Sequence, residues 1–277
     1  MNFTFVDGIQ IFYGVPSFLF YVSIQFFLGN SILRGHSEFK NEFYPLIFFY
    51  GFVDLNNYIA VIIFFDIPSW GLFTDFYVKH QLLAEIGMFL LSTNTYIIIL
   101  SNLVITTNRF VSISYPYNYD KIFCIKNLYK ILSITCTLAI SLNFPRLLYR
   151  GRYKYFNEYD VSVFLYDNNN VNKAYYVGGA FLSGTVFLVS LFLNISNLYK
   201  IINLEKGRIN HVRADLHLAI YAAILAIGLI CLNAYYVIRG IGAFMNDYAM
   251  YQCMLPHFGW IIDIIVFGSV WSLFIIR

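Results

Sequence analysis

The stretch Leu82–Ser114 has the sequence LLAEIGMFLLSTNTYIIILSNLVITTNRFVSIS, with Glu85 near its start and Arg109 near its end as its charged residues. About 20 apolar residues in a helix, each rising about 1.5 Å, are enough to cross a bilayer. This stretch is longer than that, so we expect a tilted membrane-spanning helix. A helix is the expected state because an open strand would leave backbone groups without hydrogen-bond partners in lipid.

Six further apolar stretches accompany it, and the segments between them are short. The chain of 277 residues is 59% hydrophobic and only 12% charged, whereas soluble domains carry about 25% charged residues. The sequence therefore predicts an all-α, seven-transmembrane helix bundle, with residues 1–277 forming a single domain and the first span acting as its own insertion signal. The predicted spans are Ile9–Leu28 (or on to Leu33), Phe43–Phe65, Leu82–Ser114, Leu128–Leu148, Ala174–Ile202, Leu216–Met245 and Leu255–Ile276.

The distribution of lysine and arginine predicts that the N-terminus lies outside the cell and the C-terminus inside. The basic loop after the fourth span, Arg150–Lys173, counts against this orientation. Asn2 begins an Asn-Phe-Thr pattern, which is glycosylated only outside, so Asn2 is a glycosylation candidate. Of the eighteen basic residues, those expected inside are Arg34, Lys40, Arg109, Lys121, Lys126, Lys130, Lys200, Lys206, Arg208, Arg213 and Arg277.

A few polar residues lie within the predicted spans. A charge at mid-bilayer costs about 2.5–3.5 kcal/mol on insertion scales, so Asp54 should face the bundle interior. There it is either a hydrogen-bonded packing residue or a cation- or proton-sensitive switch. Asn102 lies seven residues before Arg109, about 10 Å deeper in the membrane, which is near the expected depth of Asp54. For Asn102 and Asn94, helix packing is the default role. Asp263 could pair with another helix, but we favour a position in a ligand pocket.

The third span ends in the triplet Asn108–Phe110, and Tyr115–Phe123 follows with the sequence YPYNYDKIF. An arginine at an inner helix end can simply snorkel to the interface. This setting, however, resembles the rhodopsin-like seven-helix receptors, whose third helix ends in an acidic–Arg–aromatic triplet. It resembles more closely the nematode serpentine chemoreceptors of class gamma or a related class. The resemblance covers the whole chain in layout, and the third-helix motif carries it.

The resemblance implies a G-protein-coupled chemosensory receptor in the plasma membrane of sensory cells, and not an enzyme. Its partners would be the lipid bilayer, a small extracellular molecule bound between the outer halves of the spans, and a heterotrimeric G protein. Asn108, Arg109 and Phe110 would form the signalling switch, and neither cofactor, metal nor nucleic acid is expected. Aromatic walls with a few polar anchors are typical of small-molecule sites, although Tyr and Trp also anchor helices at membrane interfaces. The candidate ligand-binding residues are Glu85, Phe89, Ser92, Tyr175, Tyr176, Asn233, Tyr236, Trp260 and Asp263.

The chain departs from the broader receptor pattern in several places. Asn108 replaces the usual acidic residue, so an ionic lock to Arg109 is not expected. The outer disulfide, the Cys-Trp-x-Pro motif and the Asn-Pro-x-x-Tyr motif have no counterpart, and no cytoplasmic tail is expected after Arg277. A seven-helix transporter or a degenerate, non-signalling receptor are the alternatives. An enzyme with a metal site is disfavoured because the five histidines form no closely spaced cluster.

Overall fold

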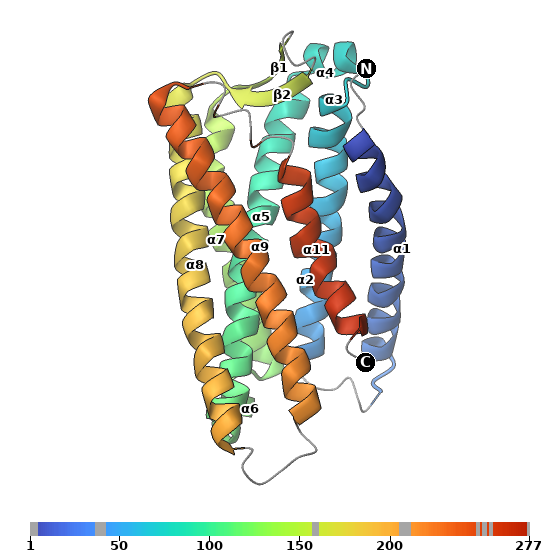
Figure 1. Ribbon diagram of the computed structural model, residues 1–277, viewed down its shortest axis with the longest axis vertical. Coiled ribbons are helices and arrows are strands. Elements are labelled where there is room, and N and C mark those ends of the chain that lie inside the picture. The colour runs from blue at the N-terminus through green and yellow to red at the C-terminus, as the bar shows by residue number, and fades with distance from the viewer. Residues whose placement is uncertain are drawn as a thin grey trace.

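The computed structural model describes residues 5–36, 43–156, 161–204, 212–247, 250, 254 and 257–275. Long helices lie side by side in an elongated bundle, and the two chain ends lie toward its opposite ends (Figure 1). The long helices are α1 (Phe5–Leu33), α2 (Phe43–Val61), α5 (Leu82–Ser114), α7 (Ile125–Asn143), α8 (Asn169–Leu204), α9 (Val212–Met245) and α11 (Phe258–Ile275).

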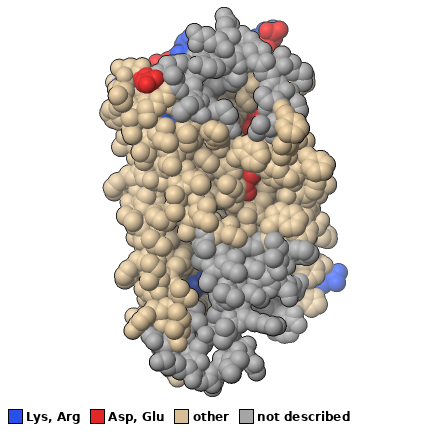
Figure 2. All heavy atoms as spheres, viewed as in Figure 1, with Lys and Arg blue, Asp and Glu red and all other residues tan. Residues whose placement is uncertain are grey.

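The surface of the bundle is that of a membrane protein. Six of the described helices are long and apolar enough to cross a bilayer, and α11 adds a shorter apolar segment, His257–Gly268. Large apolar side chains such as Phe12, Phe26 and Phe181 are exposed, and most of the described surface in Figure 2 is uncharged, with several charged atoms gathered at its upper end. Exposed apolar surface on this scale is stable in lipid rather than in water. The predicted seven-helix bundle is therefore confirmed.

Helix α5 lies at the centre of the bundle and has the bounds that the sequence predicted. Every residue from Leu91 to Ile99 is buried, which is the pattern of a helix surrounded on all sides. It packs against α2, α7 and α8. Ile99 belongs to the main core together with Leu232 of α9 and Val266 of α11, and α5 also contributes Ile105 and Met88 to smaller clusters toward its two ends.

The start of α8 shows why one predicted boundary moved. The run Asp167–Asn170 was expected to be part of a loop, yet α8 already begins at Asn169. The Asn168 side-chain oxygen accepts a hydrogen bond from the backbone N–H of Asn170 at 3.0 Å. Asparagine in this position is a favoured N-cap, because its side chain satisfies an N–H that has no partner within the helix. A turn-forming sequence therefore starts the helix five residues earlier than predicted.

The segment between α7 and α8, expected to be an irregular loop, contains a β-hairpin. A short 3-10 helix, η3 (Phe144–Leu148), leads to strands β1 (Gly151–Phe156) and β2 (Val161–Tyr166). The strands are antiparallel, with Gly151 opposite Tyr166 and Tyr153 opposite Phe164. They are rich in aromatic and β-branched residues, which favour strands. The hairpin lies across one end of the bundle (Figure 1); we call this the hairpin end, and the opposite end the Arg109 end.

The remaining described elements are short. Helix α2 continues through a π-helical segment, η2 (Ile62–Asp66), into α3 (Ile67–Ser69), and α4 (Thr74–Lys79) follows at the hairpin end. Helix α6 (Pro116–Ile122) begins with proline at its first position, where the missing N–H costs nothing. The glycosylation candidate Asn2 lies outside the described residues.

Candidate functional site

Helix α4 and the β1–β2 hairpin form a cap over the hairpin end, and two tyrosines join this cap to η2, the continuation of α2. The Tyr77 hydroxyl donates to the carbonyl of Ile63 at 2.7 Å, and the Tyr153 hydroxyl donates to the carbonyl of Phe64 at 2.9 Å. Pro68 follows these carbonyls and has no N–H, so the helix has one backbone donor fewer at this point. A buried carbonyl without a partner is costly, and the tyrosine hydroxyls supply donors here. The cap is thereby fixed to α2.

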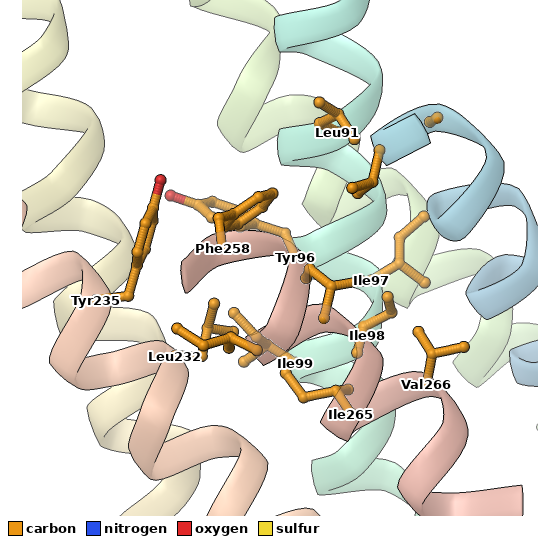
Figure 3. Close-up of a cluster of buried hydrophobic side chains, with 14 of the residues drawn as sticks. Leu91, Tyr96, Ile97, Ile98, Ile99, Leu232, Tyr235, Phe258, Ile265 and Val266 are labelled. Atoms are coloured by element: carbon orange, nitrogen blue, oxygen red, sulfur yellow. The ribbon is translucent and has the colours of Figure 1, made fainter. Parts of the chain in front are cut away.

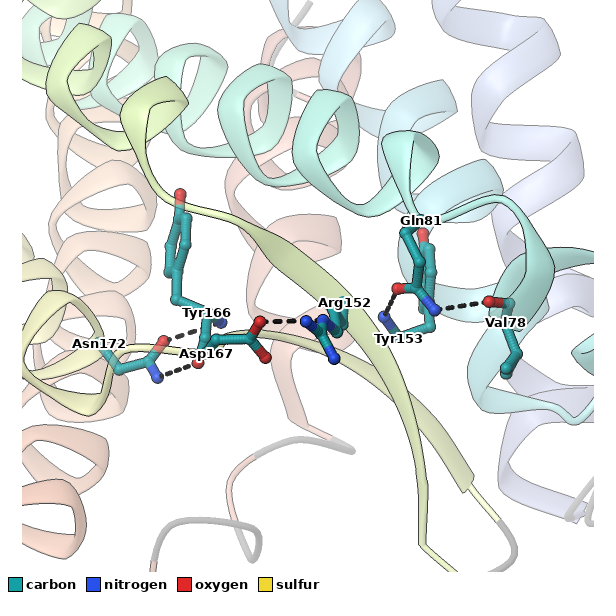
Figure 4. A network of polar contacts seen from close by, with 7 residues as sticks. All are labelled: Val78, Gln81, Arg152, Tyr153, Tyr166, Asp167 and Asn172. Carbon is teal, nitrogen blue, oxygen red and sulfur yellow. Dashed lines mark hydrogen bonds and ion pairs between the residues drawn. The ribbon is translucent and has the colours of Figure 1, made fainter.

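Side-chain amides complete the cap at both edges of the hairpin (Figure 4). Gln81 accepts a hydrogen bond from the Tyr153 N–H at 3.0 Å and donates to the carbonyl of Val78. Asn172 accepts from the Tyr166 N–H at 3.3 Å and donates to the Tyr166 carbonyl at 3.0 Å. Both amides satisfy backbone groups at strand edges, which would otherwise be unpaired. The hairpin is therefore held from the α5 side and from the α8 side.

The cap tyrosines stay protonated. Burial raises the pKa of the Tyr77 and Tyr153 hydroxyls above the ordinary value. Burial also raises the pKa of Tyr166 to about 12, although the positive charge of Arg146 acts in the opposite direction. All three phenols therefore remain hydrogen-bond donors at physiological pH.

A small cavity of about 40 Å³ lies below this cap, among α5, α8, α9 and α11. Its walls are mostly aromatic, with two arginines among them. Figure 3 shows that Leu91 and Tyr96 of α5, Tyr235 of α9 and Phe258 of α11 gather in this part of the core. The lining residues are Phe65, Met88, Leu91, Arg146, Phe164, Tyr166, Asn172, Tyr175, Tyr176, Tyr235, Arg239 and Phe258.

The two cavity arginines are held against tyrosine rings. The Arg146 guanidinium lies 4.1 Å from the ring centroid of Tyr175, and its Nη2 donates to the Tyr96 hydroxyl at 3.0 Å. Arg239, only 3% exposed, lies 4.8 Å from the ring centroid of Tyr176, and its Nη1 donates to the Tyr235 hydroxyl. Guanidinium groups stack well on aromatic faces. The rings thus hold both cations at the cavity.

Two of the predicted ligand-binding residues, Tyr175 and Tyr176, line this cavity. Tyr236 lies directly behind them, because its hydroxyl is 3.3 Å from the Tyr175 hydroxyl. Asn233 joins α9 to α8 by donating to the Ala180 carbonyl at 2.7 Å. These four side chains therefore belong to one aromatic and polar layer between α8 and α9.

The other predicted residues do not belong to the lining of this cavity. Asp263 faces α1, where it accepts hydrogen bonds from the Tyr13 hydroxyl and, at 3.0 Å, from Gln10. Trp260 also faces α1, with its ring centroid 5.5 Å from that of Tyr13. On α5, the buried Ser92 hydroxyl donates to the carbonyl of Phe89 at 3.1 Å. Glu85, also on α5, is half-buried beneath β1 at Gly151.

The structure brings Asp54 and Asn102 together, as their expected depths suggested. Both line a second cavity, of about 70 Å³, between α1, α2, α5 and α9. Tyr21 of α1 donates to an Asp54 carboxylate oxygen at 2.9 Å. Tyr50 and Ser101 also line this cavity. It is therefore a polar space in the middle of an otherwise apolar bundle, and Asn94, also buried, lies two turns of α5 away from Asn102.

The predicted switch triplet lies at the opposite end of α5, and its three side chains contact three different partners. Arg109 is 5% exposed, lies 5.3 Å from the ring centroid of Phe43, and borders a cavity of about 10 Å³ with Ser190 of α8 and Ala226 of α9. The Asn108 side chain donates to the Tyr119 hydroxyl of α6 at 3.2 Å.

Phe110, the third residue of the triplet, contacts an aromatic and basic group beside α6. Its ring centroid is 6.1 Å from that of Tyr115, and the Lys200 ammonium of α8 lies 5.1 Å from the Phe110 centroid. The triplet thus joins α5 to α2, α6 and α8, so a displacement of these helices would change its contacts.

Arg146 and Arg239 are among the basic residues expected on the outer side, and the sequence predicts no further role for them. Arg239 lies inside the predicted span Leu216–Met245, six residues before its end. A charge within a span is costly, as for Asp54, and indicates a functional or paired residue. Arg146 lies just after Pro145 at the end of the fourth span. The signal was present, but the tyrosines that surround each arginine come from distant parts of the chain.

Comparison with known proteins identifies one family. The model of the family described as serpentine type 7TM GPCR chemoreceptor Srv matches residues 10–277. This range includes α5, both arginines of the cavity and the Asn108–Phe110 triplet. No curated protein matches the chain.

Proposed function

Because the chain belongs to the Srv family of serpentine seven-transmembrane chemoreceptors, we propose that it is a G-protein-coupled chemosensory receptor in the plasma membrane of sensory cells. The predicted resemblance to nematode serpentine chemoreceptors is confirmed, with Srv as the class. Membership of a chemoreceptor family favours a receptor over the transporter alternative. In this proposal a small molecule binds at the hairpin end, which faces outward, and the Asn108–Phe110 triplet signals at the inner end.

One observation carries the proposal: α5 lines the hairpin-end cavity near one end and carries the triplet near the other. Met88 and Leu91 line the cavity, whereas Arg109 lies eighteen residues beyond Leu91, about 27 Å along the helix. A single buried helix therefore contacts both the ligand site and the signalling site. Movement of its neighbours at one end can be felt at the other, because packed cores have discrete arrangements rather than deforming continuously.

The inner surface is closed around Arg109 in this structure. Arg109 is buried, and the cavity beside it is too small for a partner's side chain. Outward movement of α9 would separate Ala226 and Leu229 from Arg109 and open this cavity. A ligand would favour the open arrangement only in so far as it binds that arrangement more tightly than the closed one. A G protein would then dock at the opened surface and contact Arg109.

The test is a cell-based G-protein activation assay on a panel of volatile and soluble small molecules, with wild type compared to Arg109→Ala. We expect at least one compound to stimulate the wild type and none to stimulate Arg109→Ala at equal surface expression. Arg34→Ala is the matched control, because Arg34 is an exposed arginine at the same end of the bundle, and it should signal normally.

Two results would count against the proposal. Stimulated signalling that survives Arg109→Ala unchanged would remove Arg109 from the switch. A wild type that reaches the cell surface yet activates no G protein would favour the degenerate, non-signalling receptor. Sodium or proton flux in liposomes would favour the transporter instead, since secondary transporters carry ions through the midplane.

A further inference from the structure

We propose that an apolar groove near the Arg109 end binds one acyl chain of an anionic phospholipid, whose headgroup is held by Lys126 and Lys130. The groove has a volume of about 710 Å³ and lies on the surface of the bundle between α1, α2 and α7. The proposal goes beyond the receptor function above. It shares with that function the orientation in which the Arg109 end faces the inside of the cell.

The groove arises because α1 and α7 pack on different partners. Helix α1 packs on α2, whereas α7 packs on α5, and residues of α2 line the space between α1 and α7. Phe48 of α2 lies close against Gly29 of α1, where an added Cβ would be 2.8 Å from the Phe48 ring. Phe52 and Tyr129, also in the lining, are 67% and 65% exposed. In a membrane this open apolar surface is covered by lipid.

The groove extends over about one leaflet of the membrane. Along α7 its lining runs from Ile125, the first residue of the helix, to Cys136, which is about 16 Å at 1.5 Å per residue. The hydrocarbon core of a bilayer is about 30 Å thick. On α1 the lining ends at Leu33, the last residue of that helix, so the groove opens at the Arg109 end. This extent matches a lipid chain of the inner leaflet better than a membrane-spanning helix of a second copy.

Two exposed lysines lie beside the open end of the groove. Ser133 of α7 belongs to the lining. Lys130 lies three residues before Ser133 and Lys126 seven residues before it, so both are neighbours of Ser133 on the surface of α7. A lysine has a long apolar stem that lies along apolar surface while its ammonium group reaches the headgroup region. Both ammonium groups can therefore meet the phosphate of a lipid whose chain fills the groove.

The positive charges at the start of α7 are not balanced by the protein that the structure describes. Lys126 and Lys130 are four residues apart, and like charges at this spacing destabilise a helix. They also lie near the N-terminal end of α7, which is itself the positive end of the helix dipole. The first turn contains no acidic residue, Cys124 makes no side-chain cap, and neither lysine lies within 4 Å of a described carboxylate. A phosphate at this place would offset these repulsions.

The headgroup, rather than the chain, determines which lipid is preferred. Lipid tails are as apolar as the groove, so burying a chain there gives little preference among lipids. Two lysines favour a headgroup with a net negative charge, and anionic phospholipids belong to the cytoplasmic leaflet, the one that contains the Arg109 end in this orientation. A sterol, whose polar group is a neutral hydroxyl, would gain little from the lysines. The occupant is therefore an anionic phospholipid such as phosphatidylserine.

The experiment labels the full chain in phosphatidylcholine nanodiscs. A small fraction of phosphatidylserine carries a photoreactive diazirine in its acyl chain, and labelled residues are located by mass spectrometry after irradiation. We expect the label to concentrate in the groove, at residues such as Phe52 and Ser133. Photoreactive phosphatidylcholine at the same fraction should label the groove less by on the order of tenfold, because each lysine contributes about fivefold to the attraction of an anionic headgroup.

Exposed positions on α6 and α7 provide variants with matched controls. Lys126→Gln and Lys130→Gln should each lower the preference for phosphatidylserine about fivefold. Lys121→Gln removes an exposed lysine of α6 at the same end and should keep the full preference. Ser133→Trp should fill the groove and remove the label there. Ile134→Trp, at a neighbouring residue that is 65% exposed and does not belong to the lining, should leave the label in place. The lysine variants decide the matter if Ser133→Trp does not fold.

Equal labelling of the groove by the two phospholipids overturns the proposal, and so does a preference that persists when both lysines are replaced by glutamine. Label spread evenly over the lipid-facing helices also overturns it. Displacement of the label by cholesterol but not by unlabelled phosphatidylserine would assign the groove to a sterol, and cross-links between two copies through Phe52 or Ser133 would assign it to a dimer. The assay uses neither a chemosensory ligand nor a G protein, so its failure leaves the receptor function standing. A chain that binds the lipid at this groove but never signals would refute only the receptor function.

Discussion

Both ends of the bundle hold buried arginines against aromatic rings, but the described hydrogen bonds around these arginines differ. At the hairpin end, Arg146 and Arg239 lie in a layer whose elements are joined by hydrogen bonds, such as those from Tyr77 and Tyr153 to the end of α2. At the Arg109 end, the described contacts of the triplet include hydrogen bonds from Asn108 to the Tyr119 hydroxyl and from the Ser112 hydroxyl to the Arg109 carbonyl. The others include cations against rings, as in Arg109 on Phe43.

This difference suggests which end is built to move. Buried hydrogen bonds are directional and costly to leave unmade, so they fix the relative positions of the elements that they join. Cation–ring contacts tolerate sliding, because they depend on distance to a ring face more than on a single angle. The hydrogen bonds of the hairpin end suit a preformed cavity, and the cation–ring contacts at the Arg109 end suit helices that shift relative to one another.

The largest effect is expected from removing the hydrogen bonds between α1 and Asp263 of α11. Asp263→Ala would remove the acceptor of both Tyr13 and Gln10, and each buried donor left without a partner costs about 1–3 kcal/mol. We expect a marked fall in the apparent melting temperature and loosening of α1 from α11, measured by thermal unfolding in nanodiscs and by cysteine accessibility along α1.

Asp263→Asn is the matched control for this loss, because the amide oxygen can still accept a hydrogen bond. It should recover much of the stability. If it recovers stability but loses ligand binding, Asp263 takes part in the ligand site, as the sequence suggested, and its packing role is secondary. An alanine variant as stable as the wild type would mean that the contacts with α1 contribute little.

A smaller effect is expected from Tyr153→Phe, which keeps the ring but removes the hydroxyl that donates to the Phe64 carbonyl. Leaving this carbonyl without its partner should cost about 1–3 kcal/mol and loosen the cap. Hydrogen exchange should then rise in β1 and β2 while the amides around Arg109 stay as protected as before. Tyr149→Phe, at an exposed tyrosine of the neighbouring turn, should change neither; equal exchange in the two variants would show that the cap does not depend on this bond.

The sequence predicted the helices because their signal is local. Apolar stretches long enough to cross a bilayer are visible without any knowledge of neighbours, and the span predicted from Leu82 to about Ser114 is helix α5. The hairpin was not predicted because its two strands are short. Strand β1 contains Arg152 and Lys154, and Asp167 follows β2 directly, so the segment resembled a charged loop. A long apolar stretch predicts a membrane-spanning helix, but no comparable sequence pattern predicts a two-stranded hairpin outside the membrane.

The candidate cavity could be predicted only in part, because it depends on which residues meet. Tyr175 and Tyr176 were chosen from their depth in the fifth span, and both line the cavity. Arg146 and Arg239 were passed over since nothing in the sequence shows that tyrosines from α5, α8 and α9 surround them. Asp263 was expected near a pocket, but its hydrogen-bond partners lie on α1, 250 or more residues away in the chain. Contacts over such separations leave no local pattern.

The smallest effect is expected from Tyr119→Phe at the Arg109 end, and it tests whether that end is the one that opens. This variant removes the hydroxyl that accepts the Asn108 hydrogen bond, a bond worth about 0.5–1.5 kcal/mol. If the bond stabilises the closed arrangement, basal G-protein activation should rise severalfold, up to about tenfold for 1.4 kcal/mol, with little change in melting temperature. Tyr117→Phe, at a tyrosine that is 96% exposed on the same short helix, is the control and should leave basal signalling as it is. A rise in both variants, or a large loss of stability in Tyr119→Phe, would mean that the Arg109 end is held as firmly as the hairpin end.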